Sequence, residues 1–259
     1  MNLVIDIGNT FTKVAVFDQD TLVRTAKYTE LTEKEILRYK TDFPDVNQVI
    51  ISSVKGKEIL KDIEPQFKDA LILTQDTPLP VKICYQTPET LGLDRIAAAV
   101  GAQHLYPEQD LLVIDAGTAI TFDFVSKAAE YKGGNISPGL QLRSKALNQF
   151  TGKLPLVTPS SPFTLTGKST SQAISNGVMF GMIYELQGYI TDYQYHYDDL
   201  KIILTGGDAD FFMENLEKCI NFSRSANYFV EKLKNSIFVV LNLNLIGLNR
   251  ILEFYVAEN

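Results

Sequence analysis

The chain has 259 residues, of which 45% are hydrophobic and 21% charged, as in a globular protein with one large or two moderate domains. Its formal net charge of −7 argues against a nucleic-acid partner, because phosphates repel an acidic surface. No apolar run reaches the roughly 18 residues that span a bilayer, and the N-terminus lacks the pattern of a signal peptide. Two cysteines, Cys84 and Cys219, are too few for a disulfide framework, so we expect a cytoplasmic protein with no membrane partner.

The first half of the chain predicts a mixed sheet with helical cover. Strands are expected at residues 2–8, 12–18, 21–28, 46–54 and 69–74. Helices are expected at residues 32–43, 56–67 and 91–106, the last after a proline-containing link at 77–90. The first helix begins with a capping-box pattern at Thr32 and is expected to turn Ile36 and Leu37 inward.

The strand-turn-strand pattern starts again near residue 110. Strands at 110–117 and 119–125 precede an expected turn-rich loop at 129–139, followed by helices at 140–150 and 170–194. Residues 200–212 are typical of a strand, a Gly-Gly turn and the start of a helix, and residues 236–254 of a helix whose beginning is rich in β-forming residues. The sequence therefore predicts two related α/β domains, residues 1–109 and 110–259.

Each half opens with an apolar strand that ends in an acidic turn, at Asp6 and at Asp115. A strand fixes such a carboxylate rigidly, and the following glycine lets a ligand approach the backbone. Asn9 and Thr10 can hold phosphate oxygens, and Lys13 adds a positive charge for a transferring phosphoryl group. A single Asp-x-Gly can also be a plain hairpin turn. Two copies, with a third strand-turn "LTGG", favour a nucleotide site gripped from both sides.

Two other glycine-containing stretches do not qualify as phosphate loops. "TGKST" ends at Thr170, but a P-loop would need glycine where this chain has Pro162, and no buried strand leads into it. "GGNISPG" at residues 133–139 does not match the dinucleotide pattern G-x-G-x-x-G. The acidic turns are therefore the best candidates for phosphate binding.

"DIGNTFTK", "DAGTAIT" and "TGG", in this order, resemble the phosphate-1, phosphate-2 and adenosine segments of the actin, heat-shock ATPase and sugar-kinase superfamily. "LGLDR", "GGNISPG", "GKST" ahead of "AISNG", and "GLNRIL" are similar to a narrower group, the type III pantothenate kinases. The resemblance implies an α/β fold with two related actin-like (ribonuclease H-like) halves, mixed sheets and a nucleotide cleft between them. It also implies ATP-dependent phosphorylation of pantothenate to 4′-phosphopantothenate, the first step of coenzyme A biosynthesis.

The same resemblance implies how ATP and cations are held. Asp6 would bind Mg²⁺ together with the ATP phosphates, since hard cations prefer carboxylate and water oxygens. The nucleotide would also contact these residues: Gly8, Asn9, Thr10, Lys13 and Thr118. Asp115 would bind a monovalent cation, potassium or ammonium; the rival interpretations are a second Mg²⁺ ligand or a plain turn residue.

Pantothenate would be bound by the motif that contains Asp94 and Arg95. Asp94 would be the general base for the primary hydroxyl, and Arg95 would pair with the pantothenate carboxylate. The alternative is that both residues merely open a helix, whose dipole favours Asp there but not Arg. The remaining expected pocket residues are Gly92, Leu93, Tyr85 and Thr170; Tyr85 could equally be a half-buried aromatic residue of a strand.

Members of the resembled family are dimers with the pantothenate pocket at the subunit boundary, so we expect a homodimer. Gly177, Gly181 and Gly188 in the long predicted helix would let another helix approach closely. Two other functions stay open: another kinase or phosphohydrolase of the same superfamily, or a non-catalytic nucleotide-binding regulator. The retained Asp6, Lys13, Asp94 and Asp115 favour an enzyme.

Overall fold

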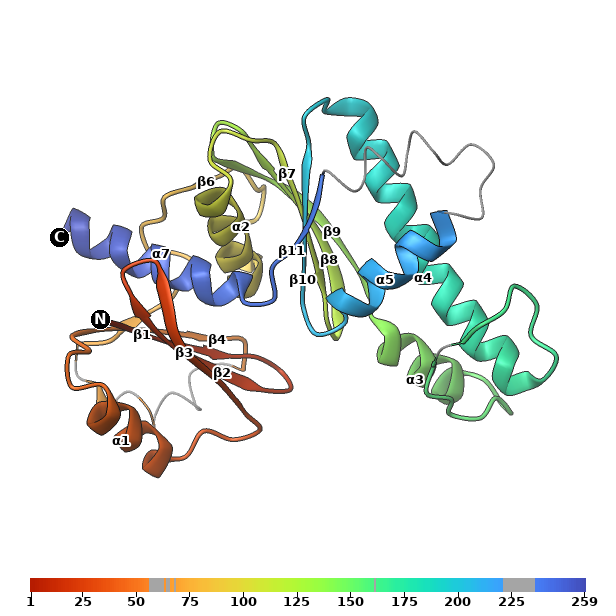
Figure 1. The fold of residues 1–259 in the computed structure, drawn as a ribbon, viewed down its shortest axis with the longest axis horizontal. Coiled ribbons are helices and arrows are strands. Elements are labelled where there is room, and N and C mark those ends of the chain that lie inside the picture. Colours follow the sequence, from red (N-terminus) through yellow and green to blue (C-terminus); the bar gives the residue numbers. More distant parts are fainter. Residues whose placement is uncertain (56–62, 64–65, 68, 161, 221–235) are drawn as a thin grey trace. The chain divides into compact units, whose positions relative to one another are not determined.

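The computed structural model describes residues 1–55, 63, 66–67, 69–160, 162–220 and 236–259 (Figure 1). The chain divides into two compact units by its internal contacts. Unit 1 contains Met1–Glu108, Ala128–Lys132 and Asn242–Asn259, and unit 2 contains Gln109–Lys127 and Gly133–Leu241. The C-terminal segment therefore packs with the beginning of the chain, although it follows all of unit 2 in the sequence.

Unit 1 is built on a five-stranded mixed sheet with the order β3-β2-β1-β4-β5. Its strands are β1 (Asn2–Ile7), β2 (Thr12–Asp18), β3 (Thr21–Tyr28), β4 (Gln48–Ser53) and β5 (Leu71–Ile72). Its helices are α1 (Glu33–Asp42), the 3₁₀ helix η3 (Pro88–Thr90), α2 (Leu93–Leu105) and α7 (Leu243–Glu258). β1 runs antiparallel to β2 and parallel to β4. Most of the helix predicted at residues 56–67 lies outside the described residues.

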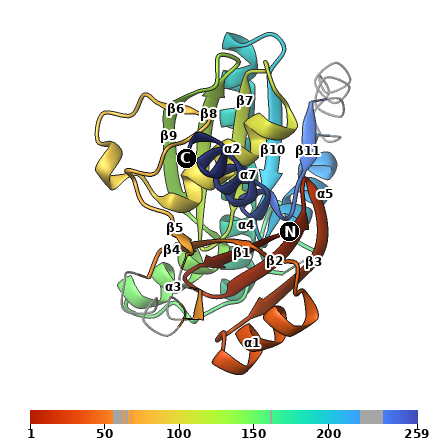
Figure 2. The same ribbon diagram turned by 90° about the vertical axis from the view of Figure 1, so that its left-hand side faces the viewer.

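The two faces of this sheet are covered by different helices. Leu3, Ile5 and Ile7 of β1 pack with Ile36 and Tyr39 of α1. Because side chains alternate along a strand, the even-numbered residues of β1 point to the opposite face. On that face α7 packs against β1, β2 and β4, and it lies beside α2 in both Figure 1 and Figure 2.

The capping box predicted at Thr32 is confirmed, because Glu35 N–H bonds to the Thr32 hydroxyl and the Glu35 carboxylate accepts from Thr32 N–H. The prediction for Leu37 is wrong, since its side chain is 47% exposed. Tyr39, three positions after Ile36, completes the buried face of α1 instead.

Unit 2 carries the strand order β11-β10-β7-β8-β9. Its strands are β7 (Leu111–Ala116), β8 (Ala119–Ser126), β9 (Glu130–Pro138), β10 (Lys201–Thr205) and β11 (Ile237–Val239). Its helices are α3 (Leu140–Phe150), α4 (Thr170–His196) and α5 (Ala209–Ile220). β7 runs antiparallel to β8 and parallel to β10, which is parallel to β11. The first residues of β9 belong to unit 1, where they pair with β6 (Lys82–Ile83).

Two predictions for this part of the chain need correction. Residues 129–139, expected to form a turn-rich loop, contain the strand β9. Residues 236–254, expected to form a helix with an ambiguous, β-rich beginning, start with the strand β11, and α7 begins only at Leu243. The other strands and helices predicted between residues 110 and 212 are confirmed, and α3 has the predicted bounds.

The core of unit 2 joins β7, β8 and β10 to α4 and α5. Buried members include Ile114, Phe122, Leu186 and Phe212, with Tyr189 stacked on Phe122 at a centroid distance of 4.0 Å. Both sheets are mixed and both are covered by helices, which confirms the predicted α/β class. None of the helices in the described part of the chain is long and apolar enough to cross a membrane.

Candidate functional site

Asp6 lies near the carboxyl end of β1, on the sheet face that α7 covers, and its side chain is buried. In the register of the sheet, Asp6 is opposite Lys13 of β2 and beside Ser52 of β4. Residues paired in this way point their side chains to the same face of a sheet. The structure therefore brings Asp6 and Lys13 together on one face. Ser52 lies there too, with its hydroxyl fully buried and no hydrogen-bond partner in the described structure.

A tight turn over residues 8–11 connects β1 to β2 next to Asp6. The N–H of Gly8 donates to the carbonyl of Phe11 at 3.0 Å, and a Cβ at position 8 would lie 3.1 Å from that oxygen. Asn9 and Thr10 are exposed at the tip. A turn with exposed amide and hydroxyl groups, next to a buried carboxylate and a lysine, can accept phosphate oxygens and an associated cation.

Asp94 and Arg95 occupy the first turn of α2, after the N-cap residue Gly92. The Asp94 carboxylate turns back toward the start of the helix and accepts a hydrogen bond from Arg95 N–H at 2.8 Å. A side chain at position 92 would obstruct this arrangement, because a Cβ there would lie 2.5 Å from Asp94 Oδ1. Leu93 between them is half-buried. The Gly-x-Asp-Arg spacing thus fixes a carboxylate at the N-terminal end of a helix.

Arg95 is only 6% exposed, which is unusual for a residue that merely opens a helix. Its guanidinium carbon lies 5.9 Å from the ring centroids of both Tyr85 and Tyr131, within the range of cation–π attraction. The two rings meet edge to face at 6.0 Å. Tyr85 follows β6 and is half-buried. Tyr85 and Arg95, each predicted separately as a pocket residue, therefore lie within cation–π range of one another, and Tyr131 of β9 completes an aromatic frame around the guanidinium.

Asp115 lies at the end of β7 in unit 2, in a position like that of Asp6. In register it is opposite Thr121 of β8 and beside Thr205 of β10. The turn that follows is one residue shorter than the turn after β1, since Ala116 pairs with Ile120 and Gly117 N–H donates to the carbonyl of Ala119. Thr118 is exposed at its tip.

Two other segments pack closely on this turn. Gly139, at the start of α3, donates its N–H to the Thr118 carbonyl at 3.0 Å. Gly206, after β10, has a φ of +95°, and a Cβ there would lie 2.5 Å from Asp115 Oδ1. Positive φ and this lack of space both require glycine. The "DAGT", "SPG" and "TGG" motifs, far apart in the sequence, thus meet around Asp115.

Asp208, which was not among the predicted site residues, belongs to the same cluster. Its N–H donates to the carbonyl of Ala116 at 3.0 Å, and its own carbonyl accepts from Phe212 in α5. Burial raises the pKa of the Asp208 carboxyl group above its ordinary value. The only sequence signal was its place directly after "TGG".

Thr170 is exposed at the first position of α4. The "GKST" segment before it forms the start of this helix and does not form a phosphate loop: Ser169 is the N-cap and accepts from Gln172 N–H, while Lys168 N–H donates to the Gln172 side chain. The rejection of a P-loop is consistent with this geometry.

The side chains at the two acidic turns suit cations that are bound partly by the protein and partly by water or substrate oxygens. In the described ranges, no three His, Cys, Asp or Glu side chains gather into a metal-binding group. Mg²⁺ commonly binds through one or two carboxylates, with water and phosphate oxygens supplying the rest, and Asp6 suits that role. At the second turn, the Asp115 carboxylate is the anionic oxygen donor, while the carbonyls of Ala116 and Thr118 accept from the N–H groups of Asp208 and Gly139.

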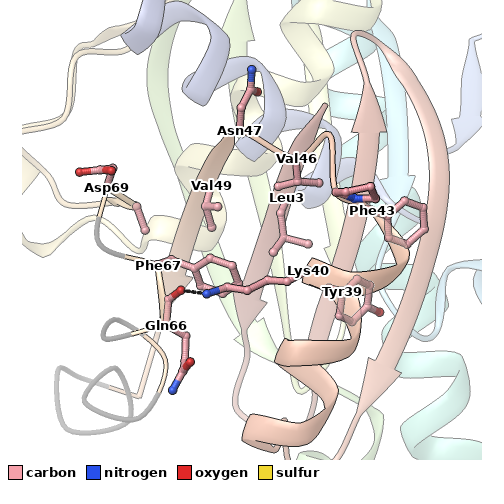
Figure 3. A pocket seen from close by; sticks show the side chains of 12 residues that line it. Leu3, Tyr39, Lys40, Phe43, Val46, Asn47, Val49, Gln66, Phe67 and Asp69 are labelled. Atoms are coloured by element: carbon pink, nitrogen blue, oxygen red, sulfur yellow. Dashed lines mark hydrogen bonds between the residues drawn. The ribbon is translucent and has the colours of Figure 1, made fainter.

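A cavity of about 270 Å³ lies elsewhere in unit 1, between the end of α1 and the sheet (Figure 3). Leu3 and Val49 form its floor, on the face opposite to Asp6, and Lys40 reaches across it to the Gln66 carbonyl. No predicted site residue lines it, so it is separate from the acidic turns.

Solved structures show which known proteins share the fold of this chain. A Baf family protein from Campylobacter jejuni aligns with a TM-score of 0.60 and 23% identity, over 98% of this chain and 99% of that one. A dehydratase activator from Clostridium difficile with bound ADPNP aligns with a TM-score of 0.54 and 10% identity, over 99% and 96%. A candidate N-acetylmannosamine kinase from Listeria monocytogenes gives 0.52 and 14% identity, over 100% and 99%. At these identities the likeness shows the fold alone, that of actin-like ATPases and sugar kinases.

Sequence relatives define the family more narrowly. The family model "Type III pantothenate kinase" matches residues 2–192. A type III pantothenate kinase of Bacteroides fragilis is 44% identical over 98% of both chains, and that of Cytophaga hutchinsonii is 42% identical over 99% of this chain and 100% of its own. With the Gly-x-Asp-Arg turn and both acidic turns in place, the chain belongs to the type III pantothenate kinase family.

Proposed function

We propose that this protein is a cytoplasmic enzyme that transfers the terminal phosphoryl group of ATP to the primary hydroxyl of pantothenate, giving 4′-phosphopantothenate for coenzyme A synthesis. The observation that carries the proposal is the turn at the start of α2, where a fixed carboxylate, Asp94, is followed by a buried guanidinium, Arg95. A carboxylate can accept the proton of an alcohol, and a guanidinium can bind a carboxylate through two parallel hydrogen bonds. Pantothenate presents both groups.

Asp94 and Arg95 divide the work on the acceptor. Arg95, held by Tyr85 and Tyr131, binds the pantothenate carboxylate and so orients the molecule. Asp94 accepts the proton of the hydroxyl as it attacks; a carboxylate suffices because the alcohol loses its proton late when the transition state is loose. Gly92, Leu93 and Thr170 would complete the pocket.

The nucleotide is assigned to the two acidic turns. We propose that the two ATPase-like halves, residues 1–109 and residues from 110 onward, each contribute one turn, with residues 242–259 belonging to the first half as they do to unit 1. The turn at residues 8–11 and Lys13 would hold phosphate oxygens, and the Thr118 turn would contact the nucleotide. A Mg²⁺ ion held by Asp6 would neutralise the charge that develops on the phosphates.

A coupled ADP-release assay with and without pantothenate tests this function. ADP release that requires pantothenate, with 4′-phosphopantothenate as product, supports the proposal. ADP release with other alcohols or polyphosphate but not with pantothenate would show another kinase or phosphohydrolase. Nucleotide binding without any turnover would show a regulator.

We further propose that potassium or ammonium binds at Asp115. Two carboxylates beside ATP concentrate negative charge, which is costly in a partly dehydrated site unless cations compensate for it. The equivalent places of Asp6 and Asp115, next to the last residues of β1 and β7, support a second cation at Asp115.

The test of the cation site is to assay dialysed enzyme in sodium, potassium and ammonium salts at equal ionic strength, so that general screening stays constant. Activity should depend on potassium or ammonium and should be lost in Asp115→Ala, while Asp198→Ala, which removes an exposed carboxylate of the same unit, should behave as wild type. Equal wild-type rates in all three salts would exclude the site.

We also propose that the enzyme is a homodimer and that α4 contributes to the interface. Gly177 and Gly188 lie on one exposed face of α4, where a Cβ would meet nothing within 4 Å. Tyr184 and Tyr195, on the same face, are 53% and 85% exposed. Glycine inside a helix costs about 1 kcal/mol relative to alanine, so a close approach by a second copy would explain why it is used.

Sedimentation velocity tests the dimer. Wild type should sediment as a dimer, and Tyr184→Glu should shift it toward monomer. Leu37→Glu, which changes an exposed apolar residue of α1, is the matched control and should leave the dimer intact. A monomeric wild type, or a Tyr184→Glu variant that remains fully dimeric, would contradict a role for this face.

A further inference from the structure

Arg143 of α3 connects two segments of unit 2 that are distant in the sequence. Its Nε donates to the Pro138 carbonyl at 2.7 Å, and Nη2 donates to the Ser137 hydroxyl at 2.8 Å. The same Nη2 pairs with the carboxylate of Glu185 in α4. The side chains of Arg143 and Glu185 are 22% and 23% exposed, so the pair is largely shielded from water. The guanidinium thus ties the end of β9 to the middle of α4.

The segment that Arg143 holds leads directly to the nucleotide turn. Gly139 follows Pro138 and donates its N–H to the Thr118 carbonyl at 3.0 Å. The contact is tight, because a Cβ at position 139 would lie 2.2 Å from the Gly117 oxygen and 2.6 Å from the Thr118 oxygen. The backbone at residues 138–139 therefore cannot move toward the turn without displacing it. If it moved away, the Thr118 carbonyl would lose its donor.

Arg143 also forms part of the first turn of α3. Arg143 N–H donates to the Gly139 carbonyl at 3.0 Å, the first backbone hydrogen bond of α3. Arg143 therefore holds the segment before α3 through both its backbone and its side chain. A guanidinium forms several hydrogen bonds in one plane, and bonds between charged groups are about twice as strong as neutral ones. Lysine could keep the charge but not this geometry.

We infer that Arg143, held by Glu185, is a positioning residue for nucleotide binding: its hydrogen bonds keep the Pro138–Gly139 backbone in contact with the turn that carries Thr118. The inference rests on the assignment of this turn to the nucleotide in the proposed function. It does not require the phosphoryl acceptor to be pantothenate. Its effect falls on ATP and ADP, and not on the acceptor motif at Gly92–Arg95, which belongs to unit 1.

The experiment compares Arg143→Ala, Arg143→Lys and Glu185→Gln with wild type and with Lys145→Ala. Lys145 is an exposed cation of the same helix and provides the matched control. Titration calorimetry with ADP and Mg²⁺ measures nucleotide binding without turnover. Steady-state kinetics separates the KM for ATP from kcat and from the KM for pantothenate. Thermal melting reports whether each variant is folded.

Arg143→Ala should weaken ADP binding and raise the KM for ATP about tenfold, equivalent to about 1.4 kcal/mol. Its KM for pantothenate should stay within about twofold of wild type, a difference below about 0.5 kcal/mol. Arg143→Lys should recover part of the lost affinity, because the ammonium can still reach a carbonyl. Glu185→Gln should show a smaller loss than Arg143→Ala, and Lys145→Ala none.

ADP binding by folded Arg143→Ala that equals wild type would overturn the inference. So would equal increases in both KM values with no recovery in Arg143→Lys, since that pattern indicates general loosening of unit 2. If Arg143→Ala does not fold, wild-type ADP binding by both Arg143→Lys and Glu185→Gln overturns the inference. A wild-type enzyme that binds ADP but does not phosphorylate pantothenate would refute the proposed function, while the comparison of ADP affinities would still decide the role of Arg143.

Discussion

Replacing Gly247 by alanine should destabilise unit 1 by forcing α7 away from α2. A Cβ at position 247 would lie 1.8 Å from the Ala97 carbonyl oxygen and 2.9 Å from Gly101 N, both backbone atoms that cannot turn aside. Ordinary contact begins at 3.4 Å, so the helices must separate locally by about 1.6 Å. Overpacking of this kind costs about 1–3 kcal/mol. A clash of 1.8 Å with a backbone oxygen belongs at the upper end of this range, about 3 kcal/mol, and alanine regains up to about 1 kcal/mol of helix propensity, which leaves a loss of about 2 kcal/mol.

Urea and thermal unfolding of wild type and Gly247→Ala measure this loss. For a chain of this size, about 2 kcal/mol lowers the melting temperature by about 4–8 °C. The control is Gly152→Ala, where the added Cβ meets nothing within 4 Å and stability should not fall. A Gly247→Ala protein as stable as wild type would show that α2 and α7 do not meet at backbone distance.

Two further variants test the acidic turns. Lys13→Ala should reduce phosphoryl transfer and ATP affinity in a folded protein, as measured by initial rates at low ATP; the control Lys34→Ala removes an exposed charge of α1, and unchanged rates in Lys13→Ala would show that Lys13 is only a surface charge. Asp208→Asn should stabilise unit 2 at pH 7.5, because burial raises the pKa of Asp208 and so makes its charged form unfavourable in the folded state. Between the unfolded and folded pKa values the native state binds more protons than the unfolded state, so the stability of wild type falls as the pH rises. The stability of wild type relative to Asp208→Asn should accordingly fall as the pH rises from the ordinary aspartate pKa of 3.8 through the raised pKa of the folded state, and a difference in melting temperature that does not grow with pH would contradict the burial of this carboxylate.

Most strands, most helices and both acidic turns could be predicted from the sequence because local pattern determines them. Apolar strands that end in Asp-x-Gly, and α3 with its bounds at 140 and 150, follow from periodicity and turn residues. β9 could not be predicted, since Gly133, Gly134, Asn135 and Pro138 are all poor strand residues. The structure gives a reason for Gly134: a Cβ there would lie 2.0 Å from the Phe122 carbonyl, so tertiary crowding overrides propensity.

The site residues, too, could be predicted only where a local sequence pattern marks them. The motif residues Asp6, Asp94 and Asp115 could be selected because each stands in a recognisable local pattern. Tyr131, which frames Arg95, was missed because its segment was predicted to be a loop. Arg143 and Glu185 carry no sequence signal, since they lie in different helices and only the packing of α3 on α4 brings them together. Residues that support a motif from a distance are the ones that sequence patterns cannot identify.

The account depends most on Asp94 as the group that activates pantothenate. Asp94→Asn keeps the size of the side chain and can still accept a hydrogen bond from Arg95 N–H, but it removes the base. The decisive measurement is the rate of 4′-phosphopantothenate formation, quantified by mass spectrometry, for wild type and Asp94→Asn, with ADP affinity measured in parallel. We predict a rate at least about 10²-fold lower in the variant with ADP affinity nearly unchanged, as expected for loss of a general base. A variant that forms 4′-phosphopantothenate at the wild-type rate would contradict the account.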